Sequence, residues 1–315
     1  MKIVTETVNG VIKEIENVCE LSFIQSADAA CDSLSIYFKP DESYDEIAFV
    51  RLYENDEIIF NGICDCQKTS EDDNGFEIYL YARSNASVLV DNEAEPFTYN
   101  APSAKQLCYS CTDSFGFKCM LPDIYSDEKY VVPRGTSSYA AVNQFVYLCT
   151  GNSIAVTSNN ELILLELSDN IKCLNTYKVI SSKETINRSE PITQINFKRS
   201  LNPNGYEMHM KAKTADELKI MKSKYVNQAS YADWQRDFTI LQKIKKSFDS
   251  YKLLDVVVSG YVSDKLLQRF SYNSKKSEFV DYALVEKRYI CDQYGERTRL
   301  TLRKIIDVKE IIYVD

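Results

Sequence analysis

Apolar and polar residues alternate along most of the first hundred positions of the chain. The stretch "SLSIYF" (Ser33–Phe38) places an apolar residue at every second position, and "EIYLYAR" (Glu77–Arg83) repeats this two-residue period. Such a period indicates β-strands with one buried face. The Asn-Gly pair within "EDDNGF" (Glu71–Phe76) is typical of the turn that closes a hairpin. We therefore predict an antiparallel β domain over residues 1–99 that closes on itself or packs as a small barrel.

The hydrophobic period changes to that of a helix just after residue 100. Ser103 precedes Gln106 by three positions, which is the spacing of a capping box at a helix start. Apolar residues then follow at helical spacing, and Gly116 stands where a C-terminal cap belongs. The pattern predicts a helix near residues 103–115.

The same design recurs about thirty residues later. Ser137, or the threonine before it, can cap a second helix near residues 137–150, and Gly151 follows its last turn. The next stretch, "SIAVTSNNELILLEL", is typical of a hairpin over residues 153–167. Two helices and a hairpin together predict an α+β module over residues 100–170.

Strand patterns return from about residue 171 and continue to residue 315. One long amphipathic pattern interrupts them near residues 231–250, where apolar positions recur with the period of a helix. We therefore predict a second antiparallel β domain over residues 171–315, with one inserted helix. The fold class is mainly β with α+β insertions, and two β blocks of similar size flank the module.

Composition and charge narrow the classes of function. Hydrophobic residues make up 44% and charged residues 26% of the 315 positions, as in ordinary globular proteins. The net charge of −9 argues against specific nucleic-acid binding, because a protein that grips phosphate needs clustered lysine and arginine. The sequence has no signal-peptide pattern and no apolar run of the roughly 18 residues that span a membrane. We expect a protein of the reducing cytoplasm with no membrane insertion.

Ten cysteines raise the question of a metal site. Cys64 and Cys66 form a Cys-x-Cys pair on a predicted strand, which sends both sulfurs to one face, and Cys108 and Cys111 lie on the apolar stripe of the first predicted helix. These positions favour packing of cysteine as a small apolar side chain. A zinc site built from these four cysteines is the alternative, and a dithiol redox centre is a weaker one.

Other catalytic chemistry finds little support in the sequence. His209 is the single histidine and lies in a strand-like run, so a Ser–His or Cys–His pair would have to use it. Carboxylates are numerous but lie mostly in turn-like segments, and no two of them stand out as a glycosidase pair. The sequence therefore predicts no catalytic residue, no cofactor and no enzyme.

Four segments resemble the baseplate hub proteins of contractile phage tails. They are "YARSNASVLVDNEAEPFTYNAPSAKQL" (Tyr81–Leu107), "VPRGTSSYAAVNQFVYLCTGNSIAVTSNNELILLE" (Val132–Glu166), "KYVNQAS" (Lys224–Ser230) and "YICDQYGERTRLTL" (Tyr289–Leu302). The order and spacing of these segments over residues 80–315 are similar to the late-control-protein-D-like group of tail hubs. The group also occurs in R-type bacteriocins, or tailocins, including diffocin-like particles.

The resemblance implies a structural protein with a defined place in a particle. It implies a homotrimer at the end of the tail tube, in which each chain carries two tube-like β-barrel domains. Three chains would present a ring of six domains to the hexameric tube and would hold the trimeric central spike at the other end. The implied partners are the tail tube protein ring, the central spike protein, other baseplate proteins and the tape measure protein.

The resemblance also sets expectations about location and about alternatives. The protein would assemble in the bacterial cytoplasm and leave the cell on lysis as part of a virion or tailocin baseplate. Cell-wall cleavage would belong to another chain. A tail-associated cell-wall hydrolase and a zinc-stabilised binding module are the alternatives, and the sequence leaves phage and bacteriocin particles equally open.

Overall fold

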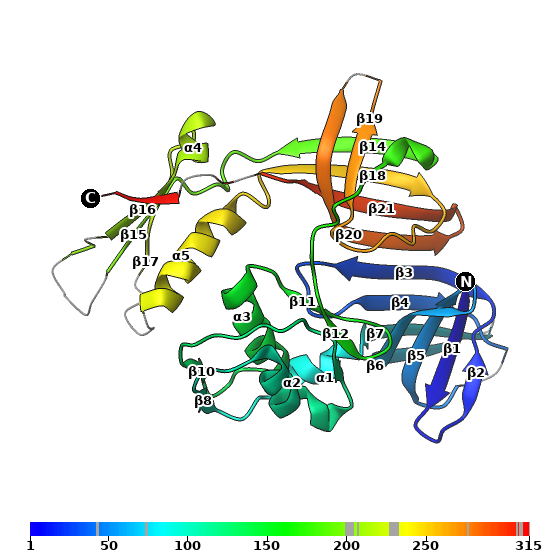
Figure 1. Ribbon diagram of the computed structural model, residues 1–315. Helices are drawn as coiled ribbons and strands as arrows, with labels where there is room; N and C mark the ends of the chain where they lie inside the picture. Colours follow the sequence, from blue (N-terminus) through cyan, green and yellow to red (C-terminus); the bar gives the residue numbers. More distant parts are fainter. Residues whose placement is uncertain are drawn as a thin grey trace.

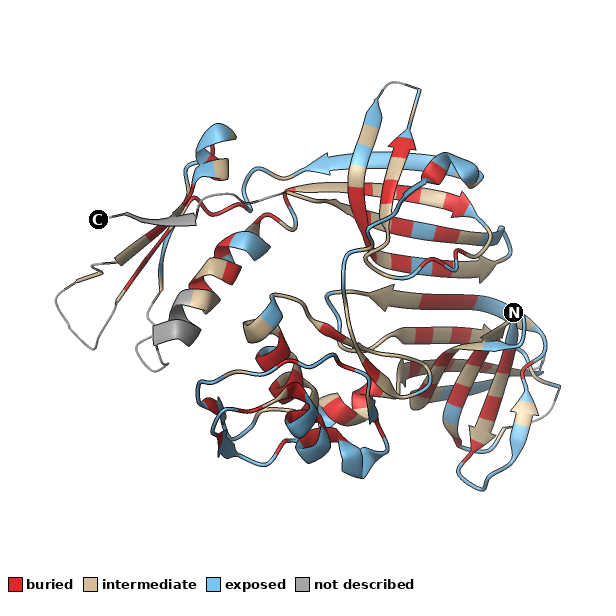
Figure 2. Cartoon of the chain, viewed as in Figure 1, coloured by how far each residue is buried: buried red, intermediate tan, exposed pale blue. Residues whose placement is uncertain are grey.

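The computed structural model describes residues 1–41, 44–72, 75–198, 205–206, 208–226, 233–275, 277–306, 308 and 311–314; for residues 72, 233–237 and 311–314 only the course of the backbone is considered. Strands dominate and helices are few, which confirms the predicted mainly β fold (Figure 1). Buried side chains alternate with partly exposed ones along most strands, and Figure 2 shows this alternation as stripes across the sheet. The two-residue period of the sequence therefore correctly indicates, for most strands, which positions face the core.

The first β block contains seven strands around an aromatic core. Its strands are β1 (Lys2–Thr7), β2 (Ile12–Glu14), β3 (Val18–Ser26), β4 (Ser33–Phe38), β5 (Ile47–Glu54), β6 (Glu57–Asp72) and β7 (Gly75–Ser84). They lie in the spatial order β3-β4-β7-β6-β5-β1-β2. Phe23, Phe38 and Phe60 are almost fully buried between them. Strands β6 and β7 pair as far as Asp72 and Gly75, and the predicted turn residues 73–74 lie outside the described residues.

The second β block continues the same sheet. Its elements are β13 (Ile171–Cys173), the 3₁₀ turn η2 (Leu174–Thr176), β14 (Val179–Ile186), β18 (Lys252–Ser259), β19 (Arg269–Asn273), β20 (Glu278–Asp292) and β21 (Gly295–Lys304). The order β14-β18-β21-β20 runs on into β3 of the first block, so thirteen described strands form a single sheet. Each block nevertheless has its own core, and Phe270, Leu284 and Leu302 are fully buried in the second.

The α+β module packs beside the first block. It consists of α1 (Ala86–Asp91), β8 (Phe97–Tyr99), α2 (Ala104–Thr112), η1 (Asp113–Phe115), β9 (Lys118–Cys119), β10 (Tyr130–Val132), α3 (Ser138–Thr150), β11 (Ile154–Val156) and β12 (Glu161–Leu164). The hydroxyl of Ser103 accepts a hydrogen bond from the Gln106 N–H, and that of Ser137 accepts one from Ala140. Gly116 and Gly151 end their helical segments in the left-handed conformation. Both helices begin and end where these four residues indicate.

The boundary of the module differs from the prediction at residue 99. Strand β8 pairs with β10 of the module, and α1 packs against α3. The strands of the first block therefore end with β7 at Ser84. The alternating pattern of Phe97–Tyr99 indicates a strand but carries no information about its partner.

The long helix of the second half belongs to a separate small unit. Helix α5 (Asp233–Ser247) packs with α4 (Lys213–Glu217) on a four-stranded sheet of β15 (Gln194–Phe197), β16 (Met208–Ala212), β17 (Ser223–Val226) and β22 (Ile311–Val314). Its buried residues Ile240 and Ile244, together with Phe248 just after its end, meet Ile195 and Phe197 of that sheet. The prediction of a helix inserted into one β domain is thus corrected to an inserted α+β unit. Residues 227–230 of "KYVNQAS" lie outside the described residues.

Candidate assembly site

A seam of paired strands joins the two β blocks. Residues Leu21–Ser26 of β3 pair antiparallel with Glu286–Cys291 of β20, and the two strands lie side by side in the middle of the molecule (Figure 1). The Nε atom of Arg288 donates a hydrogen bond of 3.0 Å to the hydroxyl of Ser22 across the seam. Tyr289 extends from β20 into the core of the first block. The seam therefore combines backbone pairing with a shared apolar core, and the blocks behave as one body.

Lys287 of the seam lies almost completely buried. Its ammonium donates hydrogen bonds to the carbonyl oxygens of Asp264, at 3.0 Å, and Val262, at 3.3 Å, and lies 5.3 Å from the ring centre of Tyr261. Burial lowers the pKa of Lys287 to about 8, and the carboxylates of Asp32 and Asp264 act in the opposite direction. The ammonium ties the loop after β18 to strand β20.

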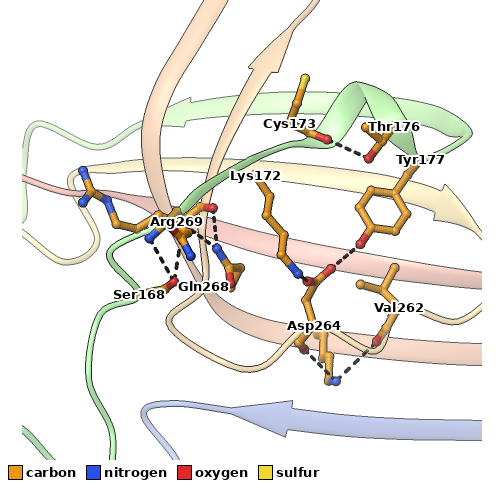
Figure 3. Close-up of polar contacts among 11 residues, drawn as sticks. Ser168, Lys172, Cys173, Thr176, Tyr177, Val262, Asp264, Gln268 and Arg269 are labelled. Atoms are coloured by element: carbon orange, nitrogen blue, oxygen red, sulfur yellow. Dashed lines mark hydrogen bonds and ion pairs between the residues drawn. The ribbon is translucent and has the colours of Figure 1, made fainter.

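Asp264 extends this polar network toward the segment before β14. Its carboxylate accepts a hydrogen bond of 2.5 Å from the Lys172 ammonium and a short one from the Tyr177 hydroxyl (Figure 3). Burial, and then the bond to Asp264, raise the pKa of Tyr177 to about 12, so the phenol stays protonated. Lys172, Tyr177 and Asp264 in Figure 3 satisfy one another's hydrogen-bonding groups. The network therefore holds the segment before β14 to the loop after β18.

Asp32 gives this region a distinct pH dependence. Burial raises the pKa of its carboxyl from 3.8 to about 6, against the hydrogen bond from Gln25 and the charge of Lys287. Between these values the native state holds a proton that the unfolded state has lost, so stability falls as pH rises through this window. We expect Asp32→Asn to remove that fall in urea denaturation between about pH 4 and 7, whereas Asp127→Asn at an exposed site should not. Parallel curves for wild type and Asp32→Asn would contradict the assignment.

The main path of the large sheet ends in β14 and β2, and no described strand covers the outer edge of either. At one end, β14 pairs only with β18 among the described strands, and every residue from Ile180 to Ile186 is exposed. The side chains of Ile180 and Ile186 are 58% and 52% exposed. At the other end lies β2, where Val11 and Ile12 are exposed as well. An uncovered edge with exposed aliphatic residues is a template for pairing with another chain.

The structure separates the cysteines that could have formed a zinc site. Cys64 and Cys66 lie on β6 in the first block, and Cys108 and Cys111 lie on α2 in the core of the module. The prediction that Cys64 and Cys66 share one face is wrong. A β-bulge between them pairs Cys64 with Ala82 and Cys66 with Tyr81, which point to opposite faces of β7. In the described part of the chain, no three or more histidine, cysteine or acidic side chains gather as metal ligands.

His209 lies on β16 of the small four-stranded sheet. Its Nδ1 atom is 2.6 Å from the Oδ1 atom of Asn196 on the neighbouring strand β15. Asn196 also accepts a hydrogen bond from Gln194. The imidazole thus takes part in a local amide network.

Over the residues that the structure describes, no helix combines the length and the apolar character needed to cross a membrane.

Sequence reasoning missed Lys287, the buried lysine that binds the loop after β18 to β20. Lys287 occurs in "LVEKRYI" (Leu284–Ile290), a strand pattern in which a lysine is expected to be exposed to solvent. The apolar run from Tyr282 to Val285, which ends two positions before Lys287, is the available signal in the sequence. A lysine this close to a core strand segment needs partners for its ammonium if it is buried, because an unpaired buried charge is costly.

The fold is that of phage tail proteins. Neither a protein-family model nor a curated protein matches the sequence. Among solved structures, the chain is similar to a 43 kDa tail protein of prophage MuSo2 from Shewanella oneidensis, with a TM-score of 0.77, 11% identity and coverage of 96% of this chain and 98% of the other.

Two further structures extend this similarity. A tail protein from Neisseria meningitidis has a TM-score of 0.75, 14% identity and coverage of 96% of both chains. A component of the type VI secretion system of Escherichia coli, described as structurally similar to the T4 bacteriophage tail proteins gp27 and gp5, has a TM-score of 0.60, 6% identity and coverage of 92% of this chain and 74% of the other. At these identities the comparison establishes the fold.

Proposed function

We propose that this protein is the structural baseplate hub of a contractile tail, a homotrimeric adaptor between the hexameric tail tube and the trimeric central spike. The observation that carries the proposal is the match of nearly the whole chain to tail proteins from two bacteria. The type VI secretion component described as similar to the tail proteins gp27 and gp5 also supports a structural role in a tail.

The two β blocks supply a physical reason for a threefold adaptor. The seam makes them one body, so three chains would present six blocks around an axis. Each chain has one uncovered edge at β14 and a second uncovered edge at β2, and different strands form the two edges. Contacts between unlike surfaces generate rings when the rotation closes. A ring of three copies joined edge to edge would therefore suit a hexameric tube on one side and a trimeric spike on the other.

The proposal includes partners, location and the absence of catalysis. The partners are the tail tube ring, the central spike, other baseplate proteins and the tape measure protein. Assembly takes place in the bacterial cytoplasm, and the particle, virion or tailocin, leaves on lysis. Cell-wall cleavage falls to another chain, and zymography of the purified protein on peptidoglycan tests this point, since clearing would favour the hydrolase alternative.

Light scattering after size exclusion tests the trimer. We expect the protein alone to have a mass three times the 36.2 kDa of one chain, or to form a complex of three chains with the trimeric spike after mixing. Ile180→Glu combined with Ile186→Glu places charge on the β14 edge and should yield monomers. Val131→Glu, at an equally exposed site of the module, is the matched control and should leave the trimer intact. A wild-type protein that stays monomeric under both conditions would overturn the proposal.

A further inference from the structure

Two cysteines of the module face each other in its core. Cys119 lies on β9 and pairs with Leu162 of β12, so both side chains project from the same face of that small sheet. Leu162 is fully buried in the core that also contains Cys108 of α2. Helix α2 packs against β9, and Cys119 packs against the same core that holds Cys108. The thiol of Cys119 acts on the ionisation of Cys108 and adds to the effect of burial in raising its pKa. Two elements that are separate in the fold thus bring the two thiols close together.

The two thiols differ in access to solvent. Cys108 is buried, whereas Cys119 is only partly covered, so a small oxidant in solution reaches Cys119 first. Burial raises the pKa of the Cys108 thiol, which lowers its thiolate fraction and makes Cys119 the thiol that reacts first. Cys111, one turn further along α2, has a different neighbour in the phenol of Tyr99.

We propose that Cys108 and Cys119 form an oxidation site that closes to a disulfide when the protein leaves the reducing cytoplasm. The release step rests on the proposed function, because a tail particle is built inside the cell and acts outside it. The co-reactant is a small-molecule disulfide such as oxidised glutathione. Cys119 attacks it and displaces one glutathione, and Cys108 then attacks the mixed disulfide and displaces the second. One protein disulfide forms, one glutathione disulfide breaks, and the two thiol protons pass to the two glutathione thiolates.

The bond would act as a staple within the module. It would close a short loop from Cys108 to Cys119 and would fix α2 to the sheet of β9, β11 and β12. A cross-link of this kind stabilises chiefly by restricting the unfolded chain. The module would thus become more resistant to unfolding in the environment in which the particle has to survive.

Peptide mapping of the full-length protein tests the proposal. Exposed Cys19 and Cys173 are first replaced by serine to suppress cross-linking between molecules. After incubation with oxidised glutathione and alkylation of free thiols, trypsin cleavage at Lys105, Lys118 and Lys129 places Cys108 and Cys119 on different peptides. We expect a linked pair of these peptides, and a rise in Tm of about 5 °C that a reductant reverses.

The variants and outcomes separate this site from other cysteines. Cys119→Ala should abolish the linked pair and the rise in Tm, whereas Cys149→Ala, at another partly buried thiol of the same core, should keep both. Free thiols at Cys108 and Cys119 after oxidation would overturn the proposal, as would a stable glutathione adduct at Cys119 or a link from Cys108 to Cys111. The wild-type map decides this even if a variant folds poorly. Light scattering on the same samples reports the trimer independently, so a failed cross-link and a failed hub are distinguishable.

Discussion

Replacing Lys287 with methionine is expected to lower the free energy of unfolding by about 3 kcal/mol. Methionine keeps most of the aliphatic stem but removes the ammonium that binds the carbonyl oxygens of Val262 and Asp264. Two buried acceptors would then lack a donor, and the nearby Asp32 carboxyl would lose a compensating charge. The gain from no longer burying a lysine offsets only part of this loss. Urea denaturation followed by circular dichroism measures the change.

The matched control for this prediction is Lys265→Met. Lys265 lies in the same loop but is exposed, so the identical substitution should change stability by less than about 0.5 kcal/mol. Combining Lys287→Met with Asp32→Asn should cost less than the sum of the two single changes, because the double variant leaves no uncompensated carboxylate. Equal stability of Lys287→Met and Lys265→Met would show that the ammonium does not stabilise the attachment of this loop to β20.

Gly62→Ala is expected to destabilise the first block by about 3 kcal/mol or more. A Cβ atom at this position of β6 would lie 2.3 Å from the carbonyl oxygen of Arg83 and 2.5 Å from the Cζ atom of Phe60. The oxygen belongs to the backbone of β7, so it can move away only if the pairing of the two strands is disturbed. Phe60 is fully buried and has little room to turn.

Ser70→Ala provides the control for Gly62→Ala on the same strand. Ser70 is exposed near the far end of β6, and alanine there meets no steric obstacle, so the cost should stay within about 0.5 kcal/mol. Soluble yield and the urea midpoint of the two variants can be compared directly. A Gly62→Ala protein as stable as Ser70→Ala would contradict the close approach of β6 and β7.

The elements that sequence patterns predict best are those whose signals are local. Ser103 and Ser137 mark helix starts because their hydroxyls bond to backbone groups three residues away, and Gly116 and Gly151 mark helix ends because they adopt positive φ. Alternation in "SLSIYF" predicts β4 because the two-residue period is complete within six neighbouring positions. Each of these signals depends on neighbours within one turn or a few strand positions.

The features that the sequence does not reveal depend on partners far along the chain. The pairing of β3 with β20 joins Ser22 to Ile290, and nothing near either residue specifies the other. The bulge at Cys64 and Cys66 is equally hidden, since strict alternation predicts a common face and the extra residue inverts it. The seam, which is the core of the candidate assembly site, could therefore not be predicted from local pattern.

The pairing of β3 with β20 also has a consequence for synthesis on the ribosome. Strand β3 ends at Ser26, whereas β20 begins at Glu278, so most of the chain is translated before its partner exists. At bacterial rates the delay is on the order of 10–50 s, during which the β3 edge has no partner within its own chain. A prematurely terminated chain never covers this edge and exposes it to aggregation and proteolysis. Only nearly full-length chains can therefore enter assembly with a completed sheet.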